Sequence, residues 1–322
     1  MGKFFRNINR AEIIKNNIAL IVLLLLVIVS TVLSPSFMTP MNIFNLLRQL
    51  VPPTLLAMGM LFVILTGGID LSVGSIVAMS AVLTAFFMKT NGLIVSILFV
   101  ILIAAVVGAV SGYFVAKRRL APFVVTLAAM SVAKGIAFMV SRGQPTRVEN
   151  DFLLSFAISY LLGVPALVWF SLIVVVLLAL VQRFTVYGRF IQAVGSNETA
   201  VTLSGINSGF YKISVYVISA VFAAIGGIVI VSRVGTGSPL AGDGAELDAI
   251  AAVVIGGASL SGGRGTVVNT FIGVLVLGLI GNIMNLLNVA SYPQMVLKGA
   301  IIIAAVLLQS GGKGKDISSS NA

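Results

Sequence analysis

An acidic residue, Asp70, stands between two long apolar runs, within Gly67-Gly68-Ile69-Asp70-Leu71-Ser72-Val73-Gly74. A carboxylate flanked by apolar segments is costly to bury, so it marks a candidate site for moving a polar solute or ion. The same carboxylate also suits the cap of a helix that begins near Ser72. The two roles are compatible, and we predict Asp70 and Ser72 as polar groups along or near a translocation path.

The pattern G-G-x-x-L-S-x-G occurs a second time, as Gly256-Gly257-Ala258-Ser259-Leu260-Ser261-Gly262-Gly263. Each copy follows one apolar run and precedes another. Glycine permits sharp backbone turns, and paired helices broken in this way form the binding sites of many transporters. The alternative is a pair of tight helical hairpins in which glycine serves packing alone. We favour the transport site because the first copy contains a carboxylate.

Several kinds of chemistry are excluded by the residues that the chain lacks. It has no His and no Cys, which removes the commonest metal ligands and histidine acid–base catalysis. The segment Gly311-Gly312-Lys313-Gly314-Lys315 lacks the spacing and the hydroxyl residue of a P-loop. We therefore predict no catalytic residues, no metal site and no cofactor, and expect the energy for transport to come from a partner or an ion gradient.

The composition is that of a protein surrounded by lipid. Of 322 residues, 59% are hydrophobic and only 9% are charged, whereas soluble domains carry roughly 25% charged residues. The net charge is +11, but the basic residues punctuate apolar runs rather than forming a stripe with aromatic residues. The predicted partner is thus the bilayer, and no nucleic acid is expected.

The apolar runs predict an all-α polytopic membrane protein, because a lipid-embedded backbone must satisfy its own hydrogen bonds. About ten crossings of ~20 residues fit the chain, and the eighth of them is short and rich in glycine. We expect a cytoplasmic segment 1–17, one transmembrane domain 18–310 and a cytoplasmic tail 311–322. The predicted crossings are 18–34, 50–67, 73–88, 93–116, 121–140, 164–182, 213–231, 247–262, 266–287 and 292–309.

With ten crossings, most Lys and Arg residues between spans fall on the side of the N-terminus, which places both termini in the cytoplasm. Two lysines, Lys134 and Lys298, remain inside spans; they must pair or snorkel, and we favour snorkelling. Asn282, Asn285 and Asn288 recur every third residue of one span. They serve either as hydrogen bonds between helices or as the polar lining of a path, and we predict Asn282 and Asn285 as path residues.

The longest cytoplasmic loop, 183–212, contains a short amphipathic helix. Ser196 or Asn197 suits its N-cap, Glu198 its first turn and Gly205 the position after its last turn. Its apolar residues indicate either a surface for a partner protein or a helix resting on lipid headgroups, and the residues alone do not decide between them.

Together these residues resemble the membrane subunits of bacterial sugar ABC importers, the ribose, xylose, galactoside and autoinducer-2 permease family. The resemblance covers 18–308 and is nearest to the ribose-type permeases. It is carried by Gly67-Gly68-Ile69-Asp70-Leu71-Ser72-Val73-Gly74-Ser75, by the loop from Gly188-Arg189 to Gly205-Ile206, and by Glu246-Leu247-Asp248-Ala249-Ile250-Ala251-Ala252-Val253-Val254 before Gly256-Gly257.

The resemblance implies a subunit of the bacterial inner membrane that translocates a small sugar by alternating access. Its implied partners are a cytoplasmic ATP-binding cassette subunit that uses the ATP, an extracytoplasmic sugar-binding protein and a second permease copy. The helix near 197–205 would couple to the ATPase, and the segments 141–151 and 233–248 would face the binding protein. The implied coupling residues are Arg189, Ala193, Gly195, Asn197, Glu198, Ala200 and Gly205. The implied docking residues are Arg142, Arg147, Asp243, Glu246 and Asp248.

Two other classes of function compete with this interpretation. An ion-coupled secondary transporter would use Asp70 as its proton or cation site. An intramembrane enzyme would need paired carboxylates, but only four acidic residues fall outside the predicted outer loops: Glu12, Asp70, Glu198 and Asp316. The source of energy for uptake separates the first of these from an ABC permease.

Overall fold

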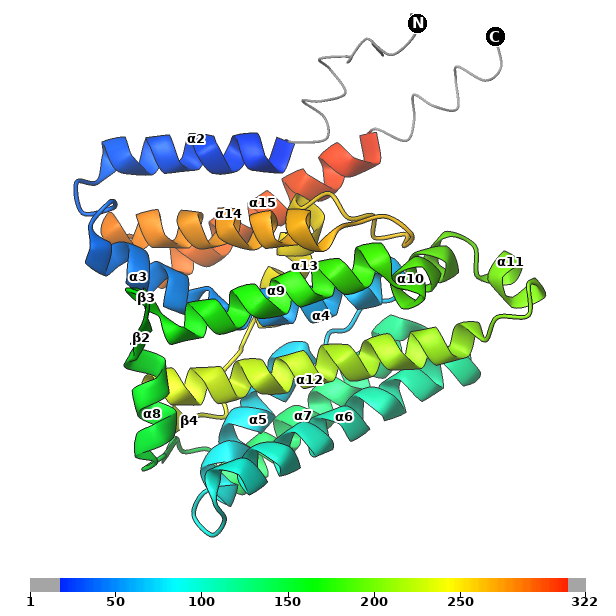
Figure 1. Ribbon diagram of the computed structural model, residues 1–322, viewed down its shortest axis with the longest axis horizontal. Helices are drawn as coiled ribbons and strands as arrows, with labels where there is room; N and C mark the ends of the chain where they lie inside the picture. Colours follow the sequence, from blue (N-terminus) through cyan, green and yellow to red (C-terminus); the bar gives the residue numbers. More distant parts are fainter. Residues whose placement is uncertain (1–17, 312–322) are drawn as a thin grey trace, which may run out of the picture.

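The computed structural model describes residues 18–311, and these fold into a bundle of helices with two small two-stranded sheets (Figure 1). The predicted segments 1–17 and 312–322 lie outside the described residues. The helices are α2 (Ile18–Leu33), α3 (Pro40–Gln49), α4 (Val51–Leu65), α5 (Val73–Phe87), α6 (Leu93–Lys117), α7 (Pro122–Ser141), α8 (Asp151–Ile158), α9 (Ala166–Phe184), α10 (Val186–Ser196), α11 (Glu198–Leu203), α12 (Ser208–Val234), α13 (Ala245–Ile255), α14 (Val267–Leu286) and α15 (Ser291–Gly311). The strands are β1 (Thr146–Arg147), β2 (Tyr160–Leu161), β3 (Val164–Pro165) and β4 (Thr236–Gly237).

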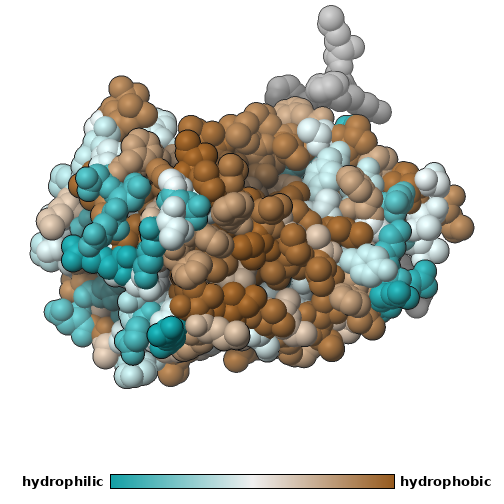
Figure 2. All heavy atoms as spheres, turned by 90° about the horizontal axis from the view of Figure 1, so that it is seen from below, coloured by the Kyte–Doolittle hydropathy of each residue, from teal (hydrophilic) through white to brown (hydrophobic). Residues whose placement is uncertain are grey.

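The surface of the bundle is suited to lipid, as the composition predicts. Six helical segments in the described residues are long and apolar enough to cross a membrane: 40–65, 93–117, 122–141, 166–184, 208–234 and 267–286. Their outward faces carry large apolar side chains such as Ile94, Val132 and Leu177. Figure 2 shows apolar residues across the middle of one face, with polar residues gathered toward its two ends. The chain is therefore a polytopic helical membrane protein.

One predicted crossing is wrong in extent. The range 247–262 predicts a full span, but α13 ends at Ile255, and the following residues through Gly262 are not helical. Eleven residues at ~1.5 Å rise reach only about half of a ~30 Å hydrocarbon core. The cause is the pair Gly256-Gly257, which ends the helix, whereas the apolar run on which the prediction depended continues past it.

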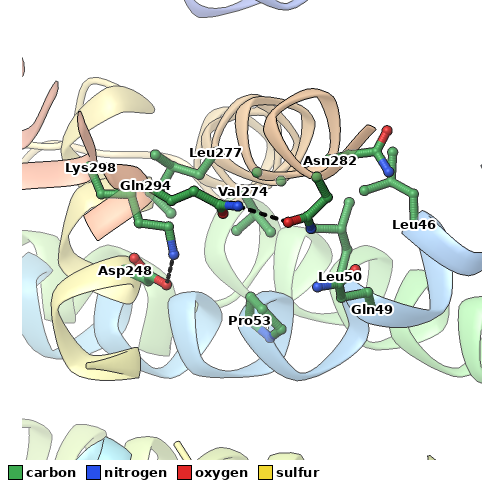
Figure 3. Close-up of a pocket in the computed structure, with 14 residues that line it drawn as sticks. Leu46, Gln49, Leu50, Pro53, Asp248, Val274, Leu277, Asn282, Gln294 and Lys298 are labelled. Carbon is green, nitrogen blue, oxygen red and sulfur yellow. Dashed lines mark hydrogen bonds and ion pairs between the residues drawn. The ribbon is translucent and has the colours of Figure 1, made fainter. Parts of the chain in front are cut away.

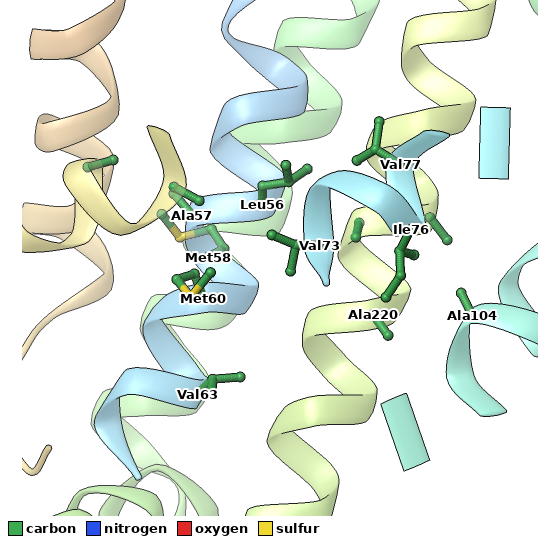
Figure 4. Packing of buried hydrophobic residues seen from close by; sticks show 14 of the residues in the cluster. Leu56, Ala57, Met58, Met60, Val63, Val73, Ile76, Val77, Ala104 and Ala220 are labelled. Carbon is green, nitrogen blue, oxygen red and sulfur yellow. The ribbon is translucent and has the colours of Figure 1, made fainter. Parts of the chain in front are cut away.

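The long helix α12 lies at the centre of the bundle and packs against α4, α5 and α6. Two glycines of α6 allow close contact. A Cβ placed on Gly108 would come within 2.8 Å of the Cβ of Ala220, and one on Gly112 within 2.8 Å of the Cα of Ile213. The small residues of α6 therefore serve helix packing. Figure 4 shows Ala104 and Ala220 in this core, beside Val73 and Ile76 of α5.

The two ends of the bundle differ in structure. At one end, β1 pairs with β4 in antiparallel register, so the predicted outer segments 141–151 and 233–248 lie together, near α8. At the opposite end lie α10 and α11, which form most of the loop 183–212 (Figure 1). The described chain enters α2 and leaves α15 on the side toward α10 (Figure 1).

The close packing of α6 on α12 predicts opposite effects for two glycine-to-alanine substitutions. Gly112→Ala should lower the free energy of unfolding by about 1–3 kcal/mol, because the new methyl group meets backbone atoms of α12. Gly135→Ala, in α7 where nothing lies within 4 Å, should be neutral or raise it by up to about 1 kcal/mol. Thermal melting of the purified protein in detergent measures both, and equal melting temperatures would contradict the packing argument.

Candidate functional site

Both copies of the glycine pattern end a helix in the same way. After α4, Gly67 has φ +80°, and the amides of Gly67 and Gly68 donate to the carbonyls of Ile64 and Val63 at 2.9 and 3.1 Å. After α13, Gly257 has φ +81°, and the amides of Gly257 and Ala258 donate to the carbonyls of Val254 and Val253 at 2.8 and 3.1 Å. Each is a Schellman motif, which needs a residue in the left-handed region. Structurally Gly67 corresponds to Gly257, one residue away from the sequence match.

The two broken helices touch each other. The amide of Gly263 donates to the carbonyl of Leu65 at 2.9 Å. A Cβ on Gly262 would lie 2.9 Å from the amide nitrogen of Gly67. The last turn of α10 covers the same point, since a Cβ on Gly195 would overlap the Leu65 carbonyl oxygen. We call this contact of Leu65, Gly67, Gly195, Gly262 and Gly263 the glycine junction, and it lies toward the end of the bundle that carries α11.

Asp70 is buried in the core with its carboxylate fully engaged. Its side chain is 1% exposed. Its Oδ1 accepts from the backbone amide of Ser72 at 3.0 Å and from the Ser72 hydroxyl at 2.6 Å, and its Oδ2 accepts from the Ser219 hydroxyl of α12 at 2.8 Å. Asp70 thus holds Ser72, the residue before α5, and fixes the first hairpin to α12. In this conformation neither Asp70 nor Ser72 lines the cavity described next.

A cavity of about 160 Å³ is lined by residues of α3, α4, α13, α14 and α15 (Figure 3). Asn282 and Asn285, both predicted as path residues, line it. Its remaining polar lining comes from the side chains of Gln49, Asp248, Gln294 and Lys298. The structure therefore brings two of the four predicted path residues into one cavity and places the other two in the core.

The amides of this cavity are paired with one another. Asn282 and Asn42 exchange two hydrogen bonds, at 2.9 and 3.1 Å. Asn285 accepts from the Gln294 side chain at 2.8 Å. Asn288 does not continue their face, because it has φ +55° and ends α14 in a third Schellman motif. The three asparagines thus have two different roles: Asn282 and Asn285 line the cavity, and Asn288 ends the helix.

The two lysines inside predicted spans are ion-paired, so the preference for snorkelling is wrong. Lys298 Nζ lies 2.7 Å from Asp248 Oδ2, in the wall of the cavity (Figure 3). Lys134 pairs with Asp243. Each pair joins a lysine of a long helix to a carboxylate of the segment 233–248. Pairing lowers the cost of a charge at membrane depth, and it engages two carboxylates that were predicted to dock a partner.

The other predicted docking residues have different surroundings. Arg142 ends α7 with φ +52° and is exposed. Arg147, in β1, is exposed beside Glu149 at 4.0 Å. Glu246 is half-buried, and its carboxylate occupies the space that a Cβ on Gly74 would need. Glu246 therefore packs the start of α13 against α5, and the two arginines are the more accessible.

The predicted short helix of the loop 183–212 is α11. The Asn197 side chain accepts from the amide of Ala200 at 2.9 Å, and Gly205 ends the helix with φ +81°, which confirms both capping predictions. Glu198 binds Lys212 at 2.5 Å. Ala200 is exposed and Leu203 is 83% exposed. Arg189, Ala193 and Gly195 belong instead to the preceding helix, α10.

Sequence reasoning missed Gln182, near the end of α9. Its side chain is buried, and its Nε2 donates to the Gly265 carbonyl at 2.8 Å while its Oε1 accepts from the Val267 amide at 2.9 Å. One side chain thus holds the loop after the second glycine pattern and the first residue of α14. A polar residue just before a charged loop gives no signal of such a role in the sequence.

Ion-paired lysines, broken helices and a polar cavity within an apolar helical bundle define a membrane protein built to pass a polar solute. The chain belongs to the family described as branched-chain amino acid transport system / permease component, which matches residues 42–306.

Curated relatives match over nearly their whole lengths. The ribose import permease protein RbsC of Escherichia coli K12 is 43% identical over 298 residues, which cover 91% of this chain and 92% of that protein. RbsC of Bacillus subtilis is also 43% identical, over 89% of this chain and 90% of its own. The L-arabinose transport system permease protein AraH of E. coli K12 is 34% identical, over 89% and 88%. No solved structure matches the chain.

Breaking the pair in the cavity wall should cost stability that a second substitution restores. Lys298→Met leaves the Asp248 carboxylate without its charged partner and should lower the free energy of unfolding by about 1–3 kcal/mol. Adding Asp248→Asn should recover part of that loss. Melting of both single variants and the double variant gives a coupling energy expected to exceed about 0.5 kcal/mol. Lys89→Met, at an exposed loop, is the control, and additive effects would refute the pairing.

Proposed function

We propose that this chain is the membrane-spanning permease subunit of an ABC importer, and that it passes a ribose-like monosaccharide across the bacterial inner membrane. The observation that carries the proposal is the 43% identity to ribose import permeases over about nine-tenths of both chains. The relative named for L-arabinose transport, at 34% identity, supports a small sugar as the class of substrate.

The proposed topology has about ten membrane-embedded segments and both termini in the cytoplasm. In this topology α13 runs inward from the outer side and ends about halfway across the membrane. The loop after it continues to the inner side, where α14 begins. The basic residues of the loop 183–212, which are Arg183, Arg189 and Lys212, then face the cytoplasm, in line with the positive-inside rule. A second permease copy, identical or closely related, completes the assembly.

The path residues that we propose are the amides Asn282 and Asn285, which line the outer cavity. Carboxamide groups both donate and accept hydrogen bonds, so they match the hydroxyl groups of a sugar. These amides are already paired with Asn42 and Gln294, which keeps them satisfied while the cavity is empty of solute. Asp70 and Ser72 act near the path by fixing the first hairpin to α12.

We further propose that α11 is the helix that docks on the ATPase. The residues that shape α11 are Asn197, Glu198, Ala200 and Gly205. The residues on α10, behind it, are Arg189, Ala193 and Gly195. The partner binds and uses the ATP, and this chain holds no cofactor of its own. At the opposite end, Arg142 and Arg147 suit an acidic surface on the sugar-binding protein. Asp243 and Asp248 are instead paired with lysines of the bundle, and Glu246 packs against α5.

The proposal predicts sugar uptake that depends on a partner ATPase. Liposomes containing this chain with its ATPase, supplied with the binding protein and ATP, should accumulate radiolabelled ribose above the external concentration. The chain alone should accumulate none, with or without a proton or sodium gradient. Concentrative uptake by the lone chain under a gradient would favour an ion-coupled secondary transporter instead.

The docking role of α11 predicts a strong effect of one exposed substitution. Ala200→Arg places a large charged side chain on the surface that meets the ATPase, and should lower ATP-driven uptake at least about tenfold, equivalent to about 1.4 kcal/mol of lost docking affinity. Membrane insertion should be normal. Thr90→Arg adds the same charge in an exposed loop away from α11 and should leave uptake unchanged. Full uptake by the Ala200→Arg variant would refute the docking role.

A further inference from the structure

We propose that the loop 256–266 transmits movement of the cytoplasmic helices to the outer cavity, and that Gln182 and Gly195 are the positioning residues that hold it. The inference rests on the proposed function, because it takes displacement of α11 by the ATPase as its cause. It assigns a role to Gln182 that neither the relatives' names nor the glycine pattern indicates.

The side chain of Gln182 attaches the loop and the start of α14 to α9 through two hydrogen bonds. The Gln182 side chain is 8% exposed, and it satisfies both the Gly265 carbonyl and the Val267 amide. Removing a buried partner costs the full desolvation of each group that it leaves unsatisfied. The loop therefore follows the end of α9 rather than moving independently of it.

The loop is also held by α10, which follows α9 after a single residue. A Cβ on Gly188 would overlap the backbone carbonyl of Gln182, so the two helices meet without a gap. At the far end of α10, a Cβ on Gly262 would lie 3.0 Å from the Cα of Gly195, and one on Gly263 would lie 3.0 Å from the Cα of Ser196. Because α11 begins two residues later, its displacement acts directly on these contacts.

The loop joins the two helices that line most of the cavity. On one side, α13 contributes Asp248 and Ala252 to the cavity; on the other, α14 contributes Asn282 and Asn285. These helices are packed backbone to backbone, because a Cβ on Gly273 would overlap the carbonyl oxygen of Ala252. Packed helices shift as units, so movement of the loop moves the cavity wall.

The backbone of the loop can absorb such a change. Its glycines at 257, 262, 263 and 265 all have positive φ, between +74° and +153°. Segments that take up large φ and ψ changes at the end of a helix act as hinges. A hinged loop transmits movement only if it is attached to the element that moves. Here Gln182, Gly195 and the Leu65 carbonyl attach the loop 256–266 to its neighbours.

The test uses Gln182→Met in the complete transporter, with ATPase and binding protein, because methionine keeps the length of the side chain and removes both hydrogen bonds. The expected result is continued ATP hydrolysis with ribose uptake reduced at least about fivefold, the lower range of typical coupling energies. Thr90→Met, in the exposed loop between α5 and α6, is the control and should transport normally. Assembly is checked by size-exclusion chromatography.

A second readout follows the cavity itself. The natural chain has no cysteine, so Gln49→Cys, on the cavity lining, gives a single reactive thiol. With Gln182 present, the rate of its alkylation should differ at least about fivefold between nucleotide-free and ATP-bound transporter. Adding Gln182→Met should abolish that difference. A purely structural role for Gln182 would lower the amount of assembled protein without removing the nucleotide dependence of what assembles.

Other outcomes have equally definite meanings. If the Gln182→Met variant does not assemble, Gln182→Glu keeps the acceptor for Val267 and loses only the donor to Gly265, and the same uncoupling is expected. Coupled uptake by either assembled variant overturns the inference. It is also overturned if the rate of alkylation of Gln49→Cys, with Gln182 present, is the same in nucleotide-free and ATP-bound transporter. Absence of ATP-driven uptake in the parent transporter would instead contradict the proposed function.

Discussion

The fold depends on backbone-to-backbone contact between the end of α4 and the loop that follows α13. The carbonyl of Leu65 accepts from the amide of Gly263, and Gly195 lies over both. Side chains are excluded from this point by their volume, since a Cβ at several of these positions would overlap neighbouring backbone. Glycine is therefore required twice over, for the left-handed turns that end α4 and α13 and for the close approach of three segments distant in sequence.

The lysines within the long helices are paired with carboxylates that lie far away in the sequence. Lys134 and Lys298 lie within long helices, and their partners Asp243 and Asp248 come from one segment that reaches the outer end of the bundle. Asp70 is satisfied in a different way, by hydroxyl and backbone donors from Ser72 and Ser219. The core thus contains a carboxylate without an opposing cation among its hydrogen-bond partners, held by the geometry of the first hairpin.

Much of this architecture was predictable from the sequence, because apolar runs and turn residues determine where helices form in lipid. Gly205 was correctly predicted as the residue that ends α11, and Asn197 is one of the two N-caps that the sequence allowed, for the same local reason. The limits of α13 were not predictable from its apolar run, since Ala258 and Leu260 are as apolar as the helix before them. The pairing of Lys298 with Asp248 and the role of Gln182 depend on residues far away in the chain, and no local pattern encodes such contacts.

The helices differ in how far they meet the membrane. In α4 nearly every residue is buried, whereas most of the apolar window of α6, α7 and α9 faces outward. A change in bilayer thickness is accommodated by tilt of the helices that touch the acyl chains. The outer helices can thus tilt to fit the surrounding lipid, while α4 is buried among other helices. The same permease fold can on this basis serve in membranes of different composition without altering its centre.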